Sequence, residues 1–137
     1  MWTMDMNETA VMLHQKSFEF AVRVVKLARF LSDKKQDWVL ARQILRSGTS
    51  IGANIRESRF AQSKADFISK LSIALKESSE TQYWLELLSA TALLTKRQYA
   101  SLKTELDWLV GTLVNVIKSS KRNLKRGPQH SDDDLTI

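Results

Sequence analysis

Apolar and small residues recur along the chain at alternating intervals of three and four positions. The pattern occupies four segments, at residues 18–32, 41–55, 67–92 and 99–116. Because an α-helix turns once every 3.6 residues, this spacing places the repeated positions on one face of each helix. The connections between the segments are short, so neighbouring helices should run antiparallel. The pattern therefore predicts an all-α fold, an antiparallel up-down four-helix bundle.

Local signals at the helix ends agree with these segments. Asp37 is a suitable N-cap for the second helix, since its carboxylate can accept hydrogen bonds from the free backbone N–H groups there. Ser63 and Asp66 form a variant of the capping box before the third helix. The start of the first helix is open, because either Ser17 or Asn7 can begin it. The core-facing stripe of that helix is predicted at Phe18, Ala21, Val25, Ala28 and Ser32, and it is widened by Val22, Val24 and Leu31.

The second and third helices should form a tight hairpin with defined facing positions. The predicted layers are Ile55 with Phe67, Ile51 with Leu71, Gly48 with Ala74, Ile44 with Ser78, and Ala41 with Thr81. The layer of Gly48 and Ala74 has almost no side-chain volume, so the two backbones should approach closely there. Across the same hairpin we expect polar links that place Arg46 and Ser47 near Glu77, and Asn54 and Glu57 near Lys70.

Composition supports one small helical domain. The chain has 137 residues, which suits a single domain, with four glycines, one proline and no cysteine. The lack of cysteine excludes disulfides and thiolate sites from this sequence, and it fits a cytoplasmic location. No stretch has the run of about 18 apolar residues that a membrane span needs. The predicted division is an N-terminal extension at 1–15, the bundle at 16–124 and a flexible tail at 125–137.

The excess positive charge lies in two segments. Formal charge is +6, from 21 basic and 15 acidic residues. Residues 16–35 carry six basic and two acidic side chains, residues 96–126 carry eight and two, and residues 127–137 carry three aspartates. A basic domain suggests a polyanionic partner. Candidate phosphate-binding residues are Arg23, Lys26, Arg29, Lys34, Lys35, Arg42, Lys118, Lys121, Arg122, Lys125 and Arg126.

The last five of these candidates would form one stripe if the fourth helix continues past residue 116. Cations near a helix C-terminus also complement the helix dipole, which is the alternative explanation. Exposed aromatic residues can stack on nucleic-acid bases, although most aromatic side chains serve the core or an interface. The candidates for stacking are Trp38, Tyr83, Trp84, Tyr99 and Trp108.

The sequence offers little to an enzyme. Glu77 and Glu80 can be imagined as a catalytic pair or as half of a metal site, but ion pairing explains them better. The two histidines, His14 and His130, do not make the Glu-x-x-His pattern of metal sites in bundles. The small residues of segment 46–55 lack the lysine of a phosphate-binding loop, and they suit a closely packed helix. No catalytic residue, metal or cofactor is predicted.

Three blocks of the sequence resemble a known bacterial family of four-helix-bundle proteins, which is encoded within intervening sequences of 23S ribosomal RNA genes. The blocks are Arg46-Ser47-Gly48-Thr49-Ser50-Ile51-Gly52-Ala53-Asn54-Ile55, Ser63-Lys64-Ala65-Asp66-Phe67, and Ile73 to Glu77 with Glu80 to Leu85. The resemblance spans about residues 17–120. The family is similar in fold to the accessory variability determinant of diversity-generating retroelements.

The resemblance implies a homo-oligomer, with a pentamer as the expected state, and binding to structured RNA or to DNA–RNA hybrids. It also implies association with a reverse transcriptase or with an interrupted ribosomal RNA, and no catalytic residue. The leading hypothesis is therefore a non-enzymatic, oligomeric bundle that binds nucleic acid through its basic surface. The alternative is a homo-oligomeric scaffold for protein–protein interaction that binds no nucleic acid.

Overall fold

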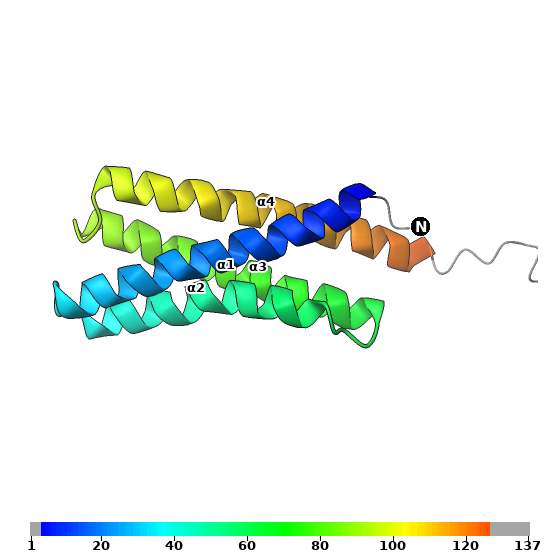
Figure 1. The fold of residues 1–137 in the computed structure, drawn as a ribbon, viewed down its shortest axis with the longest axis horizontal. Helices are drawn as coiled ribbons and strands as arrows, with labels where there is room; N and C mark the ends of the chain where they lie inside the picture. Colours follow the sequence, from blue (N-terminus) through cyan, green and yellow to red (C-terminus); the bar gives the residue numbers. More distant parts are fainter. Residues whose placement is uncertain (1–3, 127–137) are drawn as a thin grey trace, which may run out of the picture.

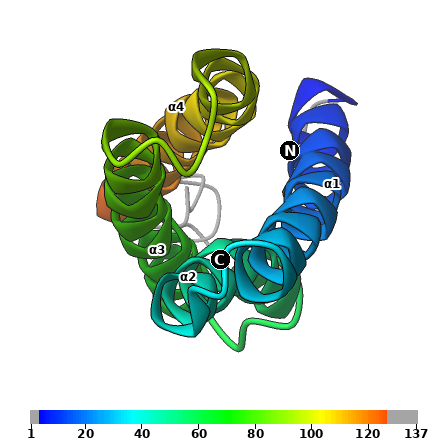
Figure 2. The ribbon, with the colours of Figure 1, turned by 90° about the vertical axis from the view of Figure 1, so that its left-hand side faces the viewer.

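The protein folds into four long helices that run up and down in chain order (Figure 1). The computed structural model describes residues 4–126, with side chains from 8 to 125. The helices are α1 (Met4–Asp33), α2 (Trp38–Ser58), α3 (Lys64–Ala90) and α4 (Lys96–Arg126). Viewed along the bundle, α1, α2, α3 and α4 follow one another around its axis (Figure 2). The predicted all-α antiparallel bundle is confirmed.

Side chains and two left-handed residues set the helix ends. Asp37 accepts a hydrogen bond from the Leu40 N–H at 3.0 Å, as predicted. Ser63 accepts from the Asp66 N–H at 3.0 Å, which confirms the second predicted cap. The sequence analysis missed a third device at α4, where Thr95 and Gln98 each accept the other's backbone N–H through their side chains. Gln36, between α1 and α2, and Ala92, between α3 and α4, adopt φ angles of 55° and 61°.

The predicted stripes of α2, α3 and α4 form most of the core. Ala41, Ile44, Ile51 and Ile55 of α2 are buried, as are Leu71 to Leu88 at the predicted α3 positions and Leu102 to Leu113 on α4. Ala92 is the exception, because α3 ends at Ala90 and Ala92 lies exposed in the turn. On α2 and α4 the apolar residues gather on one side, which left one way to orient each of these helices.

The predicted stripe of α1 was wrong in its centre, although Val24, Ala28 and Leu31, which it included, are buried. Phe18 is 58% exposed, and Val25 and Ser32 are half-buried. A second stripe fills the core instead, at Leu13, Ser17, Phe20, Val24, Leu27 and Leu31. The helix carries apolar residues on both faces, and the stripe with the larger side chains packs inward.

The region predicted as an N-terminal extension joins the bundle. α1 begins at Met4, and Leu13 lies in the core with 4% of its surface exposed. Helix and core therefore continue well before residue 16. At the other end α4 continues to Arg126, so the predicted stripe of cations lies on one helix. Residues 127–137 of the predicted tail lie outside the described residues.

The glycines of α2 allow close packing against α1, a neighbour that the sequence had not predicted for Gly48. A β-carbon at Gly48 would lie 2.7 Å from both γ-carbons of Val24. A β-carbon at Gly52 would meet the backbone carbonyl oxygen of Ser17 at 3.4 Å. The sequence predicted a close neighbour for Gly48. In the structure, the Val24 side chain of α1 lies there, because the side of α1 that carries Val24 faces α2 and the core.

Two predicted ion pairs across α2 and α3 are present. Arg46 contacts Glu77 at 3.3 Å and also Glu80, and Lys70 contacts Glu57 at 3.3 Å. These pairs are partly exposed, so each contributes little to stability.

The predicted register of that hairpin is corrected in detail. Thr81, expected opposite Ala41, donates a hydrogen bond to the Ser47 hydroxyl at 3.0 Å. The Asn54 amide donates to the Ser50 carbonyl oxygen at 2.8 Å on its own helix, so the predicted polar link from Asn54 to α3 is absent from the hydrogen bonds of the described residues. The predicted layers pair each residue of α2 with the residue of α3 at the same height, whereas the Thr81 side chain reaches along the helix axes to Ser47.

We expect Gly48→Ala to destabilise the protein by about 1–3 kcal/mol, because the added methyl group overlaps Val24. Gly111→Ala is the matched control, since a β-carbon there meets nothing within 4 Å. That variant should gain about 0.5–1 kcal/mol from helix propensity. Urea unfolding measures both. Adding Val24→Ala to Gly48→Ala should recover part of the loss. Equal stability of the two single alanine variants would contradict this packing.

Candidate nucleic-acid interface

The structure divides the predicted phosphate-binding residues between opposite ends of the bundle (Figure 1). The turn cluster lies where α1 ends and α2 begins, and consists of Lys26, Arg29, Lys34, Lys35 and Arg42. The α4 cluster lies near the end of α4, and consists of Lys118, Lys121, Arg122 and Lys125. All nine side chains are exposed. The side chain of Arg126, also predicted here, lies outside the described residues.

Arg23 does not join either cluster. Its guanidinium group forms an ion pair with Glu105 of α4 and thereby links α1 to α4. Two turns earlier on α1, the Lys16 ammonium lies 6.0 Å from the centre of the Trp108 ring of α4. These cations hold the first and last helices together, so Arg23 is removed from the predicted binding set.

The remaining cations have few partners within the protein. Among residues 8–125, the ion pairs use Arg23, Arg46, Lys70 and Lys103, and none uses a member of either cluster. The one cluster member with a described ring contact is Lys35, whose ammonium lies 5.7 Å from the centre of the Phe30 ring. Because no carboxylate in this part of the chain neutralises them, the clusters can receive an external anion.

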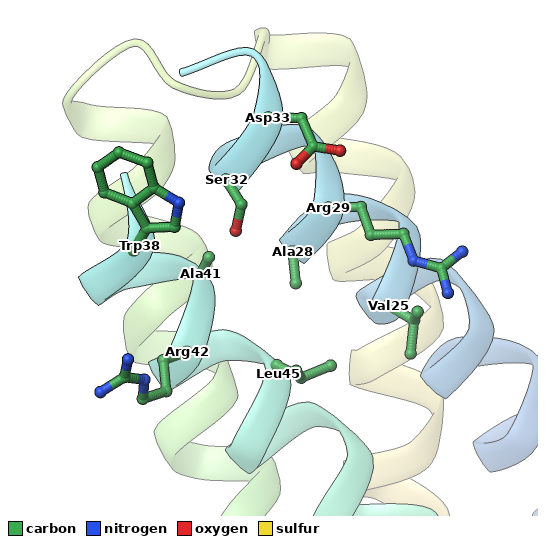
Figure 3. A pocket seen from close by; sticks show the side chains of 9 residues that line it. All are labelled: Val25, Ala28, Arg29, Ser32, Asp33, Trp38, Ala41, Arg42 and Leu45. Carbon is green, nitrogen blue, oxygen red and sulfur yellow. The ribbon is translucent and has the colours of Figure 1, made fainter. Parts of the chain in front are cut away.

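A groove lies beside the turn cluster, between the end of α1 and the start of α2 (Figure 3). Its volume is about 590 Å³. Ala28 and Ala41 line it with small side chains, and Val25 and Leu45 add apolar surface. We call this feature the Trp38 groove, after the indole on its α2 side.

Charged and polar groups surround the apolar part of the Trp38 groove. Figure 3 shows Asp33, Ser32 and Arg29 on the α1 side, and Trp38 and Arg42 on the α2 side. The guanidinium groups of Arg29 and Arg42 extend outward from opposite sides. The arrangement joins an apolar slot with a cationic rim, as is typical of surfaces that bind bases and phosphates together.

This groove was not predicted from the sequence, because the residues that line it were assigned to the core. Val25, Ala28 and Ser32, three positions of the stripe predicted to face inward, line it. The available signal was Phe20, whose large side chain shares one face with Val24 and Leu31 and favours burial of that face.

The aromatic candidates differ in access. Trp38 is 61% exposed and Tyr83 is 57% exposed. Trp84 is half-buried, donates its indole N–H to Glu80 at 3.0 Å and meets Tyr83 edge-on. Tyr99 and Trp108 are half-buried beside the core. Trp38 lines a groove that two arginines flank, whereas Tyr99 lines a smaller pocket whose one lysine, Lys103, is paired with Asp107.

The carboxylates considered for catalysis serve the fold. Glu77 and Glu80 both pair with Arg46. Within the described residues, no group of three or more His, Cys, Asp and Glu side chains is arranged to hold a metal ion. No helix in this same region is long and apolar enough to cross a membrane.

Comparison with known proteins identifies the family. The family model of the 23S rRNA-intervening sequence protein matches residues 10–115. The chain belongs to this family. A solved structure from Bacteroides thetaiotaomicron VPI-5482, described as a protein of unknown function from the S23 ribosomal protein family, is 52% identical. The match covers 80% of this chain and 98% of that one, with a TM-score of 0.79. No curated protein matches the chain.

At the end of the bundle opposite the Trp38 groove lies a second, more apolar cavity of about 370 Å³. Leu13, Ile55, Phe67 and Leu71 line it together with His14. Burial lowers the pKa of His14 from its ordinary value of 6.5, and repulsion from Arg59 and Arg56 lowers it further. Both effects disfavour the charged form of the imidazole.

This lowered pKa predicts a stability loss in acid. The unfolded chain takes up a proton at His14 near pH 6.5, whereas the folded chain does so only at lower pH. The stability that neutral His14 allows is fully present above pH 6.5, and it is lost as the pH falls from there through the pKa of the folded state. His14→Gln should flatten the decrease in unfolding free energy below pH 6.5, measured by urea titration. Arg59→Gln should raise the NMR-titrated pKa of His14, and an unchanged pKa would contradict the assigned cause.

Proposed function

We propose that this protein binds nucleic acid, without catalysing a reaction, through the turn cluster and the α4 cluster. The observation that carries the proposal is the set of nine exposed cations that have no carboxylate partner among the described residues. Phosphate contacts of this kind are largely independent of sequence. The family description refers to 23S ribosomal RNA, which makes structured RNA the first ligand to test, with a DNA–RNA hybrid as the second.

The α4 cluster exceeds what the helix dipole requires. The dipole acts mainly within the last turn of a helix. Lys118 and Lys121 lie more than one turn before Arg126, where the dipole contributes little. Lys118, Lys121, Arg122 and Lys125 recur at intervals of three, one and three residues, so they lie along one side of α4. A stripe of this length suits the regular phosphate spacing of a nucleic-acid backbone.

Neutralising this stripe should reduce the salt dependence of binding. Each lost phosphate contact lowers the slope of log affinity against log salt concentration by about 0.7–0.9. The variant Lys121→Gln/Arg122→Gln/Lys125→Gln should therefore reduce the slope by about 2–3, measured by fluorescence anisotropy with a labelled RNA hairpin.

The matched control is Lys70→Gln/Lys76→Gln/Lys103→Gln, which removes the same charge from other positions. Lys70 and Lys103 already pair with Glu57 and Asp107. This variant should keep the parent slope. Equal losses in both variants would show that net charge alone attracts RNA, and absence of binding by the parent at low salt would refute the proposal.

A second proposal, self-association as a scaffold, rests on exposed apolar side chains. Phe18, Val39 and Phe60 are between 58% and 80% exposed. Large exposed apolar residues often mark interfaces. A homo-oligomer, with a pentamer as the state implied by the family resemblance, is compatible with nucleic-acid binding at the basic ends. As a scaffold alone, the protein would bind no nucleic acid.

Phe18→Asp should lower the number of subunits measured by multi-angle light scattering, because a buried carboxylate opposes an apolar interface. Gln15→Asp introduces the same charge at an exposed position one turn away on α1 and should keep the parent state. A monomeric parent would contradict self-association. The same subunit number in all three proteins would place the interface away from Phe18.

A further inference from the structure

The Trp38 groove has the shape and chemistry of a site for a flat ring. Ala28 and Ala41 line it, and their small side chains leave space between the two helices. The Trp38 indole stands at its α2 side with 61% of its surface exposed (Figure 3). An indole kept out of the core offers a stacking face, at the cost of leaving apolar surface in water.

The turn before α2 fixes the backbone from which this indole projects. Trp38 is the first residue of α2, directly after the capping residue Asp37. The Asp37 side chain accepts from the Leu40 N–H, and the Asp37 N–H donates to the Leu31 carbonyl oxygen at 2.9 Å. These bonds join the start of α2 to the end of α1, so the backbone of Trp38 keeps its place beside the groove.

The charges around the groove separate phosphate from base. Arg29 and Arg42 extend from opposite sides and belong to the turn cluster (Figure 3). Asp33 lines the groove itself, and its carboxylate repels a phosphate placed inside. A nucleic-acid backbone therefore follows the arginine rims. An inserted base presents donors to Asp33 and Ser32, which are the polar side chains on the α1 side.

We propose that the Trp38 groove holds one unpaired base, stacked on the indole, with the flanking phosphates on Arg29 and Arg42. The inference rests on the nucleic-acid binding proposed above and specifies which part of the ligand enters this site. A paired base is stacked within its duplex and cannot enter the groove without flipping out. The protein should therefore prefer RNA with loops or single-stranded segments to a continuous duplex.

The same observations oppose a second copy of the chain as the occupant. An apolar helix seated in the groove would place apolar side chains against Asp33 and would leave Arg29 and Arg42, which extend outward, without an anionic partner. Burial of unpaired charges is strongly unfavourable. A base with its phosphates leaves both arginines paired and the carboxylate in contact with hydrogen-bond donors.

The test compares oligouridine with a blunt duplex of the same number of phosphates, both at low salt. Trp38→Ala should weaken binding of the single strand by about 5- to 150-fold, the range for loss of one stacked base. Its affinity for the duplex and its salt slope should stay at the parent values. Trp38→Phe should retain most of the single-strand affinity, because the phenyl ring also stacks. Tyr83→Ala, the control at another exposed aromatic residue, should change neither.

Each failure has a distinct meaning. If the parent binds both ligands equally and Trp38→Ala matches it, the base site is wrong while the proposed function stands. If neither ligand binds to the parent, the proposed function itself fails. If Trp38→Ala changes the subunit number in light scattering, the groove is an interface between copies and the base site is overturned.

Discussion

The close approach of α1 to α2 at two glycines determines how the rest of the bundle is arranged. Gly48 leaves room for the Val24 side chain, and Gly52 leaves room for the backbone of Ser17. Because Val24 fits against Gly48, the stripe that includes Phe20 and Leu31 faces the core. The other apolar stripe of α1 is then left alongside α2, where it lines the Trp38 groove. The fit of Val24 against Gly48 thus accounts both for the core-facing side of α1 and for the side of α1 that lines the Trp38 groove.

The basic residues fall into two groups with different physical roles. Arg23, Arg46 and Lys70 pair with carboxylates on neighbouring helices. Such partly exposed pairs add little free energy, but they fix which helix faces lie opposite one another. The turn cluster and the α4 cluster lie toward helix ends, and their members form none of the ion pairs among the described residues. An excess of positive charge is thereby kept at both ends of the bundle, in a family whose description refers to ribosomal RNA.

Prediction from sequence succeeded where each helix had one apolar stripe. The seam of α2 from Ala41 to Ile55 was correct because its opposite face is polar, and the ion pairs of Arg46 and Lys70 followed from it. It failed on α1, where both faces carry apolar residues and periodicity alone ranks them equally. The groove could not be predicted for the same reason, since three of its residues had been placed in the core.

The sequence by itself determined the number of helices, their order, two of their caps and the faces of α2, α3 and α4. It also determined the cations, although not their neighbours. Only the tertiary structure decided which side of α1 is buried, that Gly48 faces Val24, and that Arg23 pairs with Glu105 while Arg29 and Arg42 remain exposed. Periodicity is a property of one helix, whereas steric fit and ion pairing depend on the helices brought against it.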